Sequence, residues 1–201
     1  MLKLLLQALW KPVLAVVAIV AIVGPPAFIY FGVYDVAATR QHTPPVYYVL
    51  IASLHRSIKA HAAREAPLPP GDLDTPARVD AGLVLYDANC AVCHGAPGVS
   101  PHPLGLGMTP PPANLVIQGR EWAPQELYWT VSNGLKMTGM PAFAFRMTED
   151  ELWSTVAFLR AMPHMAPVDY AAHHVRLIPS GTARGPAAEP IPPPGGPEEA
   201  R

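Results

Sequence analysis

The sequence predicts an all-α protein, and three observations lead to this fold class. Apolar residues recur at helical spacing in several separate segments, and helix-start signals open most of them. No segment between them has the alternation of apolar and polar residues that indicates a strand. The first segment is apolar without interruption, which predicts an N-terminal transmembrane helix ahead of a folded domain. The 201 residues are enough for one ordinary domain and an appendage.

The composition excludes several functional classes. The chain has 14 Lys and Arg residues, 15 Asp and Glu residues and a formal net charge of -1, so it gives no indication of binding to nucleic acid. Its 26 prolines concentrate in linkers, one loop and the tail, where a missing N–H removes no helical hydrogen bond. Only two cysteines are present, Cys90 and Cys93, and this excludes a scaffold of several disulfides.

The predicted transmembrane helix is the uncharged run of residues 13–34. At about 1.5 Å per residue this run is long enough to cross a hydrocarbon core of about 30 Å. Lys3 and Lys11 precede it and Asp35 follows it, so the positive-inside rule places the N-terminus in the cytoplasm and the rest of the chain outside. A cleaved signal peptide is the alternative, because residues 36–38 resemble a cleavage site. The run exceeds the roughly 7–15 apolar residues of a signal peptide, which favours an anchor.

Residues 45–65 are expected to form the next helix. Apolar side chains recur there at helical spacing, while basic residues occupy other positions. The apolar positions are Val46, Val49, Leu50, Leu54 and Ile58. This helix lies either along the membrane or on the folded domain. Residues 66–71, Ala-Pro-Leu-Pro-Pro-Gly, break the pattern and are interpreted as the linker into that domain.

Further helices follow from local signals. Thr75, followed by proline, is an N-cap signal for a helix that runs to Cys90. Residues 124–133 form the next helix, which a glycine can terminate. Residues 148–151, Thr-Glu-Asp-Glu, are a capping box that opens the last one. Residues 98–114 form a loop rich in proline and glycine, which stays ordered in a compact domain only if it packs on something.

One short motif carries chemistry, Cys90-Ala91-Val92-Cys93-His94. The two thiols lie one helical turn apart, so both can reach the two vinyl groups on one edge of a haem. The next residue offers an imidazole to the iron. This pattern indicates covalent attachment of a c-type haem.

Three other interpretations of the cysteines each lack a required partner. A redox-active site of the thioredoxin type needs a βαβ context, which the sequence does not predict. A tetrahedral zinc site needs four ligands, and the nearest additional candidate, His102, gives a doubtful set. A disulfide between cysteines so close on a helix is geometrically awkward. The haem interpretation is therefore favoured.

A later loop supplies the candidates for a sixth iron ligand. Met137 and Met140 both lie in residues 133–143, and Met140 is favoured. Gly139 lets the backbone pass close to a porphyrin, and Pro141 restricts Met140 to an extended conformation. Other methionines are interpreted as packing or surface residues, the usual role of this residue type. These are Met108, Met147, Met162 and Met165.

In their order and combination, these motifs resemble the class I cytochromes c, of the bacterial, membrane-anchored kind. The resemblance covers about residues 75–162. Besides the haem motif and Gly95, it rests on several shorter features. These are Gly82 and Tyr86, residues 111–115, Asn133-Gly134, residues 139–143, Leu152-Trp153 and Phe158-Leu159.

The resemblance implies a fold and a set of contacts. The first and last helices of a cytochrome c fold cross at right angles, and Gly82 would allow close approach to an aromatic residue such as Trp153. A proline carbonyl in the loop after the motif would accept a hydrogen bond from Nδ1 of His94 and fix its tautomer. Pro101 and Pro103 are the two candidates.

Several aromatic and histidine residues outside the motif have two possible interpretations. Tyr128 and Trp129 are candidates for contact with the haem, although aromatic residues at helical spacing more often belong to the core. Histidines outside the motif are expected to be solvated. Among them His102 is the candidate for an exchange of iron ligands.

The expected organisation has four parts. Residues 1–36 are the cytoplasmic end and transmembrane anchor, and residues 37–74 are a juxtamembrane helix and linker. Residues 75–165 are the cytochrome c haem domain. Residues 166–201 are an extended, proline-rich and disordered tail.

The predicted function is electron transfer rather than enzymatic catalysis. The protein is expected to be a carrier, or a cytochrome subunit of a respiratory chain or oxidoreductase complex. One covalent haem c would be bound by Cys90, Cys93, His94 and Met140. The expected partners are redox proteins such as a dehydrogenase, a quinol-oxidising complex or a terminal oxidase. The expected location is the bacterial inner membrane, crossed once, with the haem domain in the periplasm or on the outer side.

Two alternatives belong to other functional classes. If Met140 does not bind iron, a five-coordinate haem would fit a peroxidase or a gas sensor. The first 66 residues would otherwise fit a structural subunit that tethers the haem domain in a larger complex.

Overall fold

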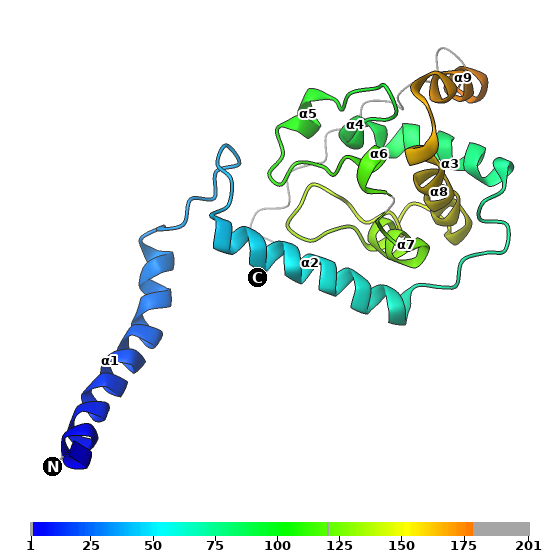
Figure 1. The fold of residues 1–201 in the computed structure, drawn as a ribbon. Helices are drawn as coiled ribbons and strands as arrows, with labels where there is room; N and C mark the ends of the chain where they lie inside the picture. The colour runs from blue at the N-terminus through cyan, green and yellow to red at the C-terminus, as the bar shows by residue number, and fades with distance from the viewer. Residues whose placement is uncertain (1, 120, 179–201) are drawn as a thin grey trace, which may run out of the picture. The chain divides into compact units, whose positions relative to one another are not determined.

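The computed structural model describes residues 2–119 and 121–178, with the backbone alone for residues 2–9 and Gln118. Within these ranges the structure is helical and contains no strand, which confirms the all-α fold class. The helices are α1 (Leu2–Tyr30), α2 (Pro44–Glu65), α3 (Pro76–Asn89), α4 (Ala91–His94), α5 (Pro103–Leu106), α6 (Leu115–Gln118), α7 (Pro124–Asn133), α8 (Glu149–Ala161), the 3₁₀ helix η1 (Met162–His164) and α9 (Pro167–Leu177), shown in Figure 1.

The chain divides into two compact units, residues 1–40 and 41–201. The first unit contains α1, in which the 21 residues Trp10–Tyr30 have a mean hydropathy of 2.4 and no residue is buried. This segment is long and apolar enough to cross a membrane. A signal sequence near the N-terminus can also form a helix this long and apolar.

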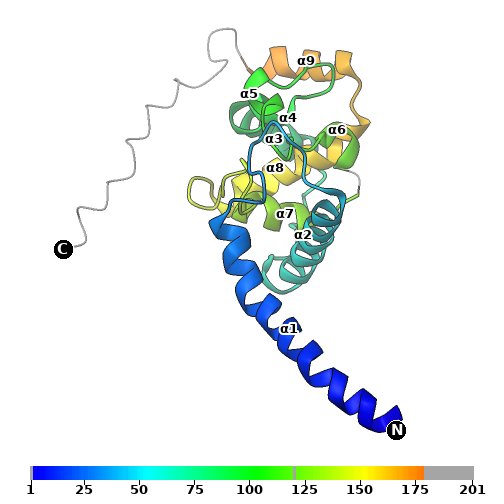
Figure 2. The ribbon, with the colours of Figure 1, turned by 90° about the vertical axis from the view of Figure 1, so that its left-hand side faces the viewer.

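The second unit is built around the crossing of α3 and α8. A Cβ atom on Gly82 would lie 1.9 Å from the backbone oxygen of Ser154 and 2.8 Å from Cβ of Phe158, so only glycine allows this approach. The expected close approach to an aromatic residue is therefore present, and the aromatic residue nearest to Gly82 is Phe158. Figures 1 and 2 show α3 and α8 at the centre of the unit. The largest fully buried side chains are Tyr86, Phe158, Leu83, Met162, Val156 and Thr155.

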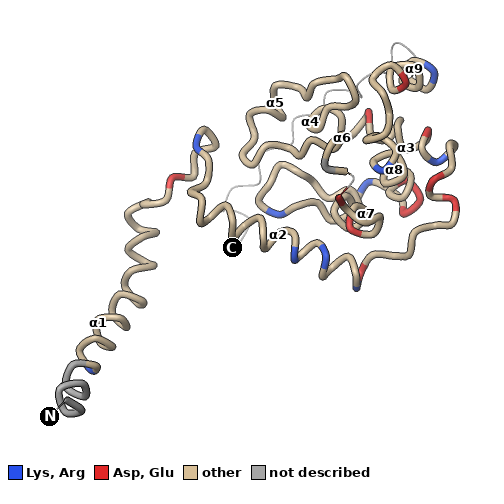
Figure 3. Tube along the Cα trace, in the orientation of Figure 1, with Lys and Arg blue, Asp and Glu red and all other residues tan. Residues whose placement is uncertain are grey.

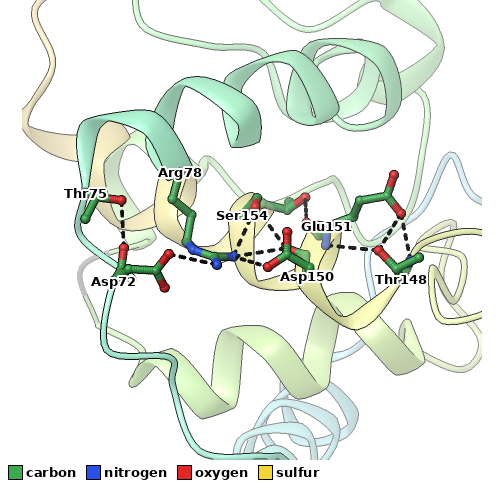
Figure 4. A network of polar contacts seen from close by, with 8 residues as sticks. Asp72, Thr75, Arg78, Thr148, Asp150, Glu151 and Ser154 are labelled. Atoms are coloured by element: carbon green, nitrogen blue, oxygen red, sulfur yellow. Dashed lines mark hydrogen bonds and ion pairs between the residues drawn. The ribbon is translucent and has the colours of Figure 1, made fainter.

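Hydrogen bonds and ion pairs stabilise the start of α8 and connect it to α3 (Figure 4). The backbone N–H of Thr148 donates to the Glu151 carboxylate over 2.7 Å, and the Glu151 N–H donates to the Thr148 hydroxyl over 3.3 Å, so the predicted capping box is present. Arg78 on α3 pairs with Asp150 at 2.8 Å and with Asp72 at 3.0 Å. These contacts fix the end of α3 that lies opposite the cysteine motif.

The second half of α2 packs on the domain. Ile58 and Ala62 are buried, and the indole N–H of Trp129 on α7 donates to the Glu65 carboxylate over 2.8 Å. His61 stacks on the same indole with ring centroids 5.5 Å apart. Residues 41–74 therefore belong to the same compact unit as the predicted haem domain.

The expectation of an extended tail from residue 166 is wrong for Pro167–Leu177, which form α9. Tyr170 is buried, and the ion pairs of α9 reach α3, which is distant in the sequence. They join His173 and Arg176 to Asp80, at 3.0 and 2.7 Å, and His174 to Asp87, at 3.0 Å. Contacts with residues far away in the sequence therefore hold this helix in place. The remainder of the predicted tail, residues 179–201, lies outside the described residues.

Candidate haem site

The cysteine motif forms a tight turn at the end of α3. Cys90 is the C-cap of α3 and begins α4, which ends at His94. The backbone N–H groups of Cys93 and His94 both donate to the Cys90 carbonyl, each over 3.0 Å. The structure therefore brings three of the predicted site residues together. Both cysteines are free and half-buried.

The environment of the thiols disfavours the competing interpretations. Burial raises the pKa of the Cys90 thiol to about 12, so it is protonated at neutral pH and is not a ready thiolate for redox exchange or for zinc. Within residues 2–119 and 121–178, no group of three or more His, Cys, Asp or Glu side chains is placed to hold a metal ion. A Cys90 thiol that keeps its proton disfavours both the redox and the zinc interpretation.

The His94 imidazole is prepared to bind a metal through one nitrogen. Its Nδ1 lies 2.8 Å from the carbonyl oxygen of Ala113, where an N–H must donate. Burial lowers the pKa of His94, which keeps the ring neutral. A neutral imidazole protonated at Nδ1 has its Nε2 lone pair free, and a hydrogen bond of this kind makes that nitrogen a better ligand.

The expected acceptor for His94 was Pro101 or Pro103, and this prediction is wrong because Ala113 provides the carbonyl. Pro103 begins α5 instead, and that helix packs on the motif. A Cβ on Gly105 would lie 3.0 Å from the Cys93 carbonyl oxygen. Helix α5 lies beside the motif, and the chain then returns to the His94 imidazole at Ala113. Sequence spacing does not reveal this path.

The backbone directly after His94 is also fixed. Gly95 adopts a φ of 66°, a left-handed conformation that favours glycine. Its carbonyl accepts a hydrogen bond from the buried Tyr86 hydroxyl over 2.6 Å. Burial raises the pKa of Tyr86, so the hydroxyl keeps its proton and remains a donor. Helix α3 thus holds both ends of the haem motif.

Met140 lies in the loop that connects α7 to α8. Gly134 ends α7 with a φ of 64°, and the Leu135 N–H donates to the Met140 carbonyl over 3.2 Å. Thr138 closes the loop, because its hydroxyl donates to the Leu135 carbonyl over 2.7 Å and accepts from the Met140 N–H over 3.1 Å. These hydrogen bonds fix the backbone of the loop on both sides of Thr138 and at Met140.

Of the two predicted thioether candidates, only Met140 packs inward. It is half-buried against the same core as Cys90. Met137 is 95% exposed and has a φ of 61°. Met108, which the sequence suggested to be a packing or surface residue, lies beside this loop. A Cβ on Gly139 would be 2.6 Å from the Met108 sulfur, so the Met108 side chain is in close contact with the backbone of Gly139.

The remaining candidates take structural roles. Tyr128 is buried and stacks on Trp153 with centroids 4.5 Å apart, while Trp129 contacts α2. His102 is the N-cap of α5, and its Nδ1 accepts from the Leu104 N–H over 3.2 Å. Sequence reasoning did not identify Ala113 or Thr138. Ala113 lies within residues 111–115, Pro-Pro-Ala-Asn-Leu, which are among the features of the family resemblance. This segment was the available signal for the acceptor of the His94 hydrogen bond.

The residues present fit a haem c group. The donor set consists of two free thiols on one turn, an imidazole with one free nitrogen, and an inward-packed thioether. Partly buried apolar side chains, including Ala91, Leu115 and Val116, pack on the same core. Soft sulfur and imidazole ligands in apolar surroundings suit haem iron rather than a hard cation.

Comparison with known proteins leads to the same assignment. Residues 77–159 match the family model described as cytochrome c oxidase, cbb3-type, subunit III. The chain is 33% identical over 132 residues to a quinohemoprotein alcohol dehydrogenase of Comamonas testosteroni, a match that covers 64% of this chain and 18% of that relative. No solved structure matches significantly. The chain therefore contains a cytochrome c domain, the kind of domain that transfers electrons through haem c.

Proposed function

We propose that this protein is a membrane-anchored one-electron carrier with a single haem c. Cys90 and Cys93 would attach the haem covalently, and His94 and Met140 would ligate its iron. The observation that carries this proposal is the His94 imidazole, which directly follows the two thiols and has Nδ1 committed to Ala113 at 2.8 Å. When bound, haem c supplies one-electron chemistry through its ferric and ferrous states.

The chain's own residues tune and protect this site. Ala113 orients the His94 ring and strengthens Nε2 as a ligand. A thioether from Met140 would favour the ferrous state and give a higher reduction potential than a second imidazole. Thr138 limits the motion of the Met140 backbone. No residue is required to break a bond of a substrate.

The electron donor or acceptor is proposed to be an oxidoreductase of a respiratory chain. The relative's name describes an alcohol dehydrogenase that contains haem, and the part of it that matches this chain is 18% of its length. This likeness supports a dehydrogenase as one of the partners. Helix α1 supports an anchor in the inner membrane, with the haem domain on the outer side.

The ligand assignment is tested by the optical spectrum of the oxidised full-length protein. We expect the weak far-red band of methionine bound to ferric haem, and Met140→Ala should abolish it. Met137→Ala is the matched control and should leave it unchanged, because that side chain is 95% exposed. Persistence of the band in Met140→Ala would contradict the assignment and point to the neighbouring Met108.

Two further results would contradict the proposal of a one-electron carrier with covalently bound haem. Rapid binding of carbon monoxide by the reduced wild type would favour an open iron site, as in a peroxidase or gas sensor. Removal of the haem by acid and organic solvent from the wild type would exclude covalent attachment. Cys90→Ala and Cys93→Ala should each lose one thioether bond and shift the spectrum of the reduced pyridine complex.

A further inference from the structure

The packing of α2 on α7 accounts for the buried residues of its second half and not for the apolar residues of its first half. Its second half has an inward side that includes the buried residues Ile58 and Ala62. Its first half, Pro-Pro-Val-Tyr-Tyr-Val-Leu-Ile-Ala-Ser-Leu (residues 44–54), has no charged residue on any side. A helix that is apolar all round is normally buried in protein or lipid. This half is not buried in the described part of the protein.

The exposed side of the first half is apolar and aromatic. Tyr48 and Val49 are each 69% exposed, and Tyr47 and Leu50 are also exposed. Single apolar residues on a surface are ordinary, but a continuous patch on successive positions marks a contact surface. Tyrosine is a residue that membrane interfaces favour, because its ring is apolar and its hydroxyl is polar.

The second half of α2 adds positive charge. Arg56, Lys59 and Arg64 are all exposed, and Figure 3 shows the basic residues of α2 in blue. Glu65, at the end of the helix, receives hydrogen bonds from His61 and Trp129 and so faces the domain. Exposed apolar and aromatic side chains together with exposed basic side chains are the combination with which a helix binds an anionic membrane surface.

The chain also keeps α2 close to the membrane, if α1 is an anchor as proposed above. The apolar span ends at Tyr30 and α2 begins at Pro44. The intervening residues 31–43 cannot extend beyond about 45 Å even when fully stretched. A helix with lipid-binding character that is tethered this near to a bilayer meets lipid at a high effective concentration.

We propose that the exposed face of α2, defined by Tyr48, Val49, Arg56, Lys59 and Arg64, binds the surface of an anionic bilayer. Tyr48 and Val49 enter the boundary between headgroups and acyl chains, and the three basic residues contact lipid phosphates. The inward face of α2 stays on α7. The domain is thereby held in one orientation on the membrane, and this inference rests on the proposed anchor.

The test uses the full-length haem-loaded protein in nanodiscs of phosphatidylcholine with or without phosphatidylglycerol. Spin labels are placed at Val49→Cys, at Ile19→Cys in the apolar span, and at Val175→Cys on the exposed side of α9. Haem content is checked for each variant, and measurements are made on the reduced protein. Relaxation by oxygen reports lipid, and relaxation by a water-soluble nickel chelate reports water.

We expect the Val49 label to gain oxygen relaxation and lose nickel relaxation in anionic discs, as the Ile19 label does, while the Val175 label remains aqueous. Changing Arg56, Lys59 and Arg64 to Gln together should return the Val49 label to water in anionic discs. An aqueous Val49 label beside an immersed Ile19 label would overturn this inference and leave the anchor intact. An aqueous Ile19 label would overturn the anchor itself. A Val49 label shielded from both reagents would show a protein contact, and would also overturn the inference.

Discussion

The two sides of the candidate haem site are built differently. On the histidine side, the motif is continuous with α3, and α3 crosses α8 so closely that only Gly82 fits. On the methionine side, Met140 lies in a loop outside the helices, where the Thr138 hydroxyl bonds both Leu135 and Met140. The histidine side therefore shares the stability of the core. The methionine side can change its conformation without unfolding the domain.

The largest effect is expected from a change that breaks the histidine side. In Gly82→Ala the new Cβ would lie 1.9 Å from the backbone oxygen of Ser154, and backbone cannot move aside as a flexible side chain can. Overpacking typically costs about 1–3 kcal/mol, and a clash with backbone places this substitution at the upper end of that range. We expect a corresponding fall in the free energy of unfolding by guanidinium chloride.

Gly71→Ala is the matched control, since nothing lies within 4 Å of a Cβ at that position. Its free energy of unfolding should be close to that of the wild type. Equal stability of both variants would show that the close crossing of α3 and α8 does not support the histidine side.

The same contrast explains what the sequence could predict. Signals confined to a few residues, such as Thr75 with Pro76 and the capping box of Thr148, located helix starts to within a residue. The thiols and imidazole of the motif were likewise predicted from local spacing. The bounds of α7 were also correct, because proline opens it and Gly134 closes it.

Features that depend on distant contacts were not predictable in this way. The carbonyl that faces His94 belongs to Ala113 because α5 packs on the motif and redirects the loop. Helix α9 was missed because its partners, Asp80 and Asp87, lie in α3. Met108 contacts Gly139, which lies in a different loop, and no pattern in the sequence relates these two loops.

A smaller effect is expected on the methionine side. Thr138→Val keeps the shape of the side chain but removes the hydroxyl that bonds both Leu135 and Met140. Global stability should fall by only about 1 kcal/mol. The far-red methionine band should nevertheless disappear at a lower temperature or lower alkaline pH than in the wild type.

Thr138→Ser retains the hydroxyl and should keep the band close to its wild-type behaviour. If the band proved equally persistent in Thr138→Val, the loop would be held by other contacts. The proposed difference between the two sides would then be wrong.

The smallest effect concerns α2, which supports α7 and through it the start of the methionine loop. Hydrogen bonds from His61 and then from Trp129 lower the pKa of the Glu65 carboxyl below its ordinary value of 4.5. A carboxyl with a lowered pKa in the folded state stabilises that state above its unfolded-state pKa. This contribution is lost as the pH falls through the folded-state value, so it is present at neutral pH and fades in acid.

Amide hydrogen exchange, corrected for its intrinsic pH dependence, measures this loss. Protection should decrease in α2 below about pH 4.5 while α3 and α8 stay protected, because the close crossing at Gly82 and fully buried side chains such as Tyr86 and Phe158 hold these two helices together in addition to their polar contacts. In Glu65→Gln, α2 should already be less protected at neutral pH and should lose most of its pH response. Simultaneous loss of protection in α2, α3 and α8 would mean that α2 unfolds only with the core, and the methionine side would then share the stability of the histidine side.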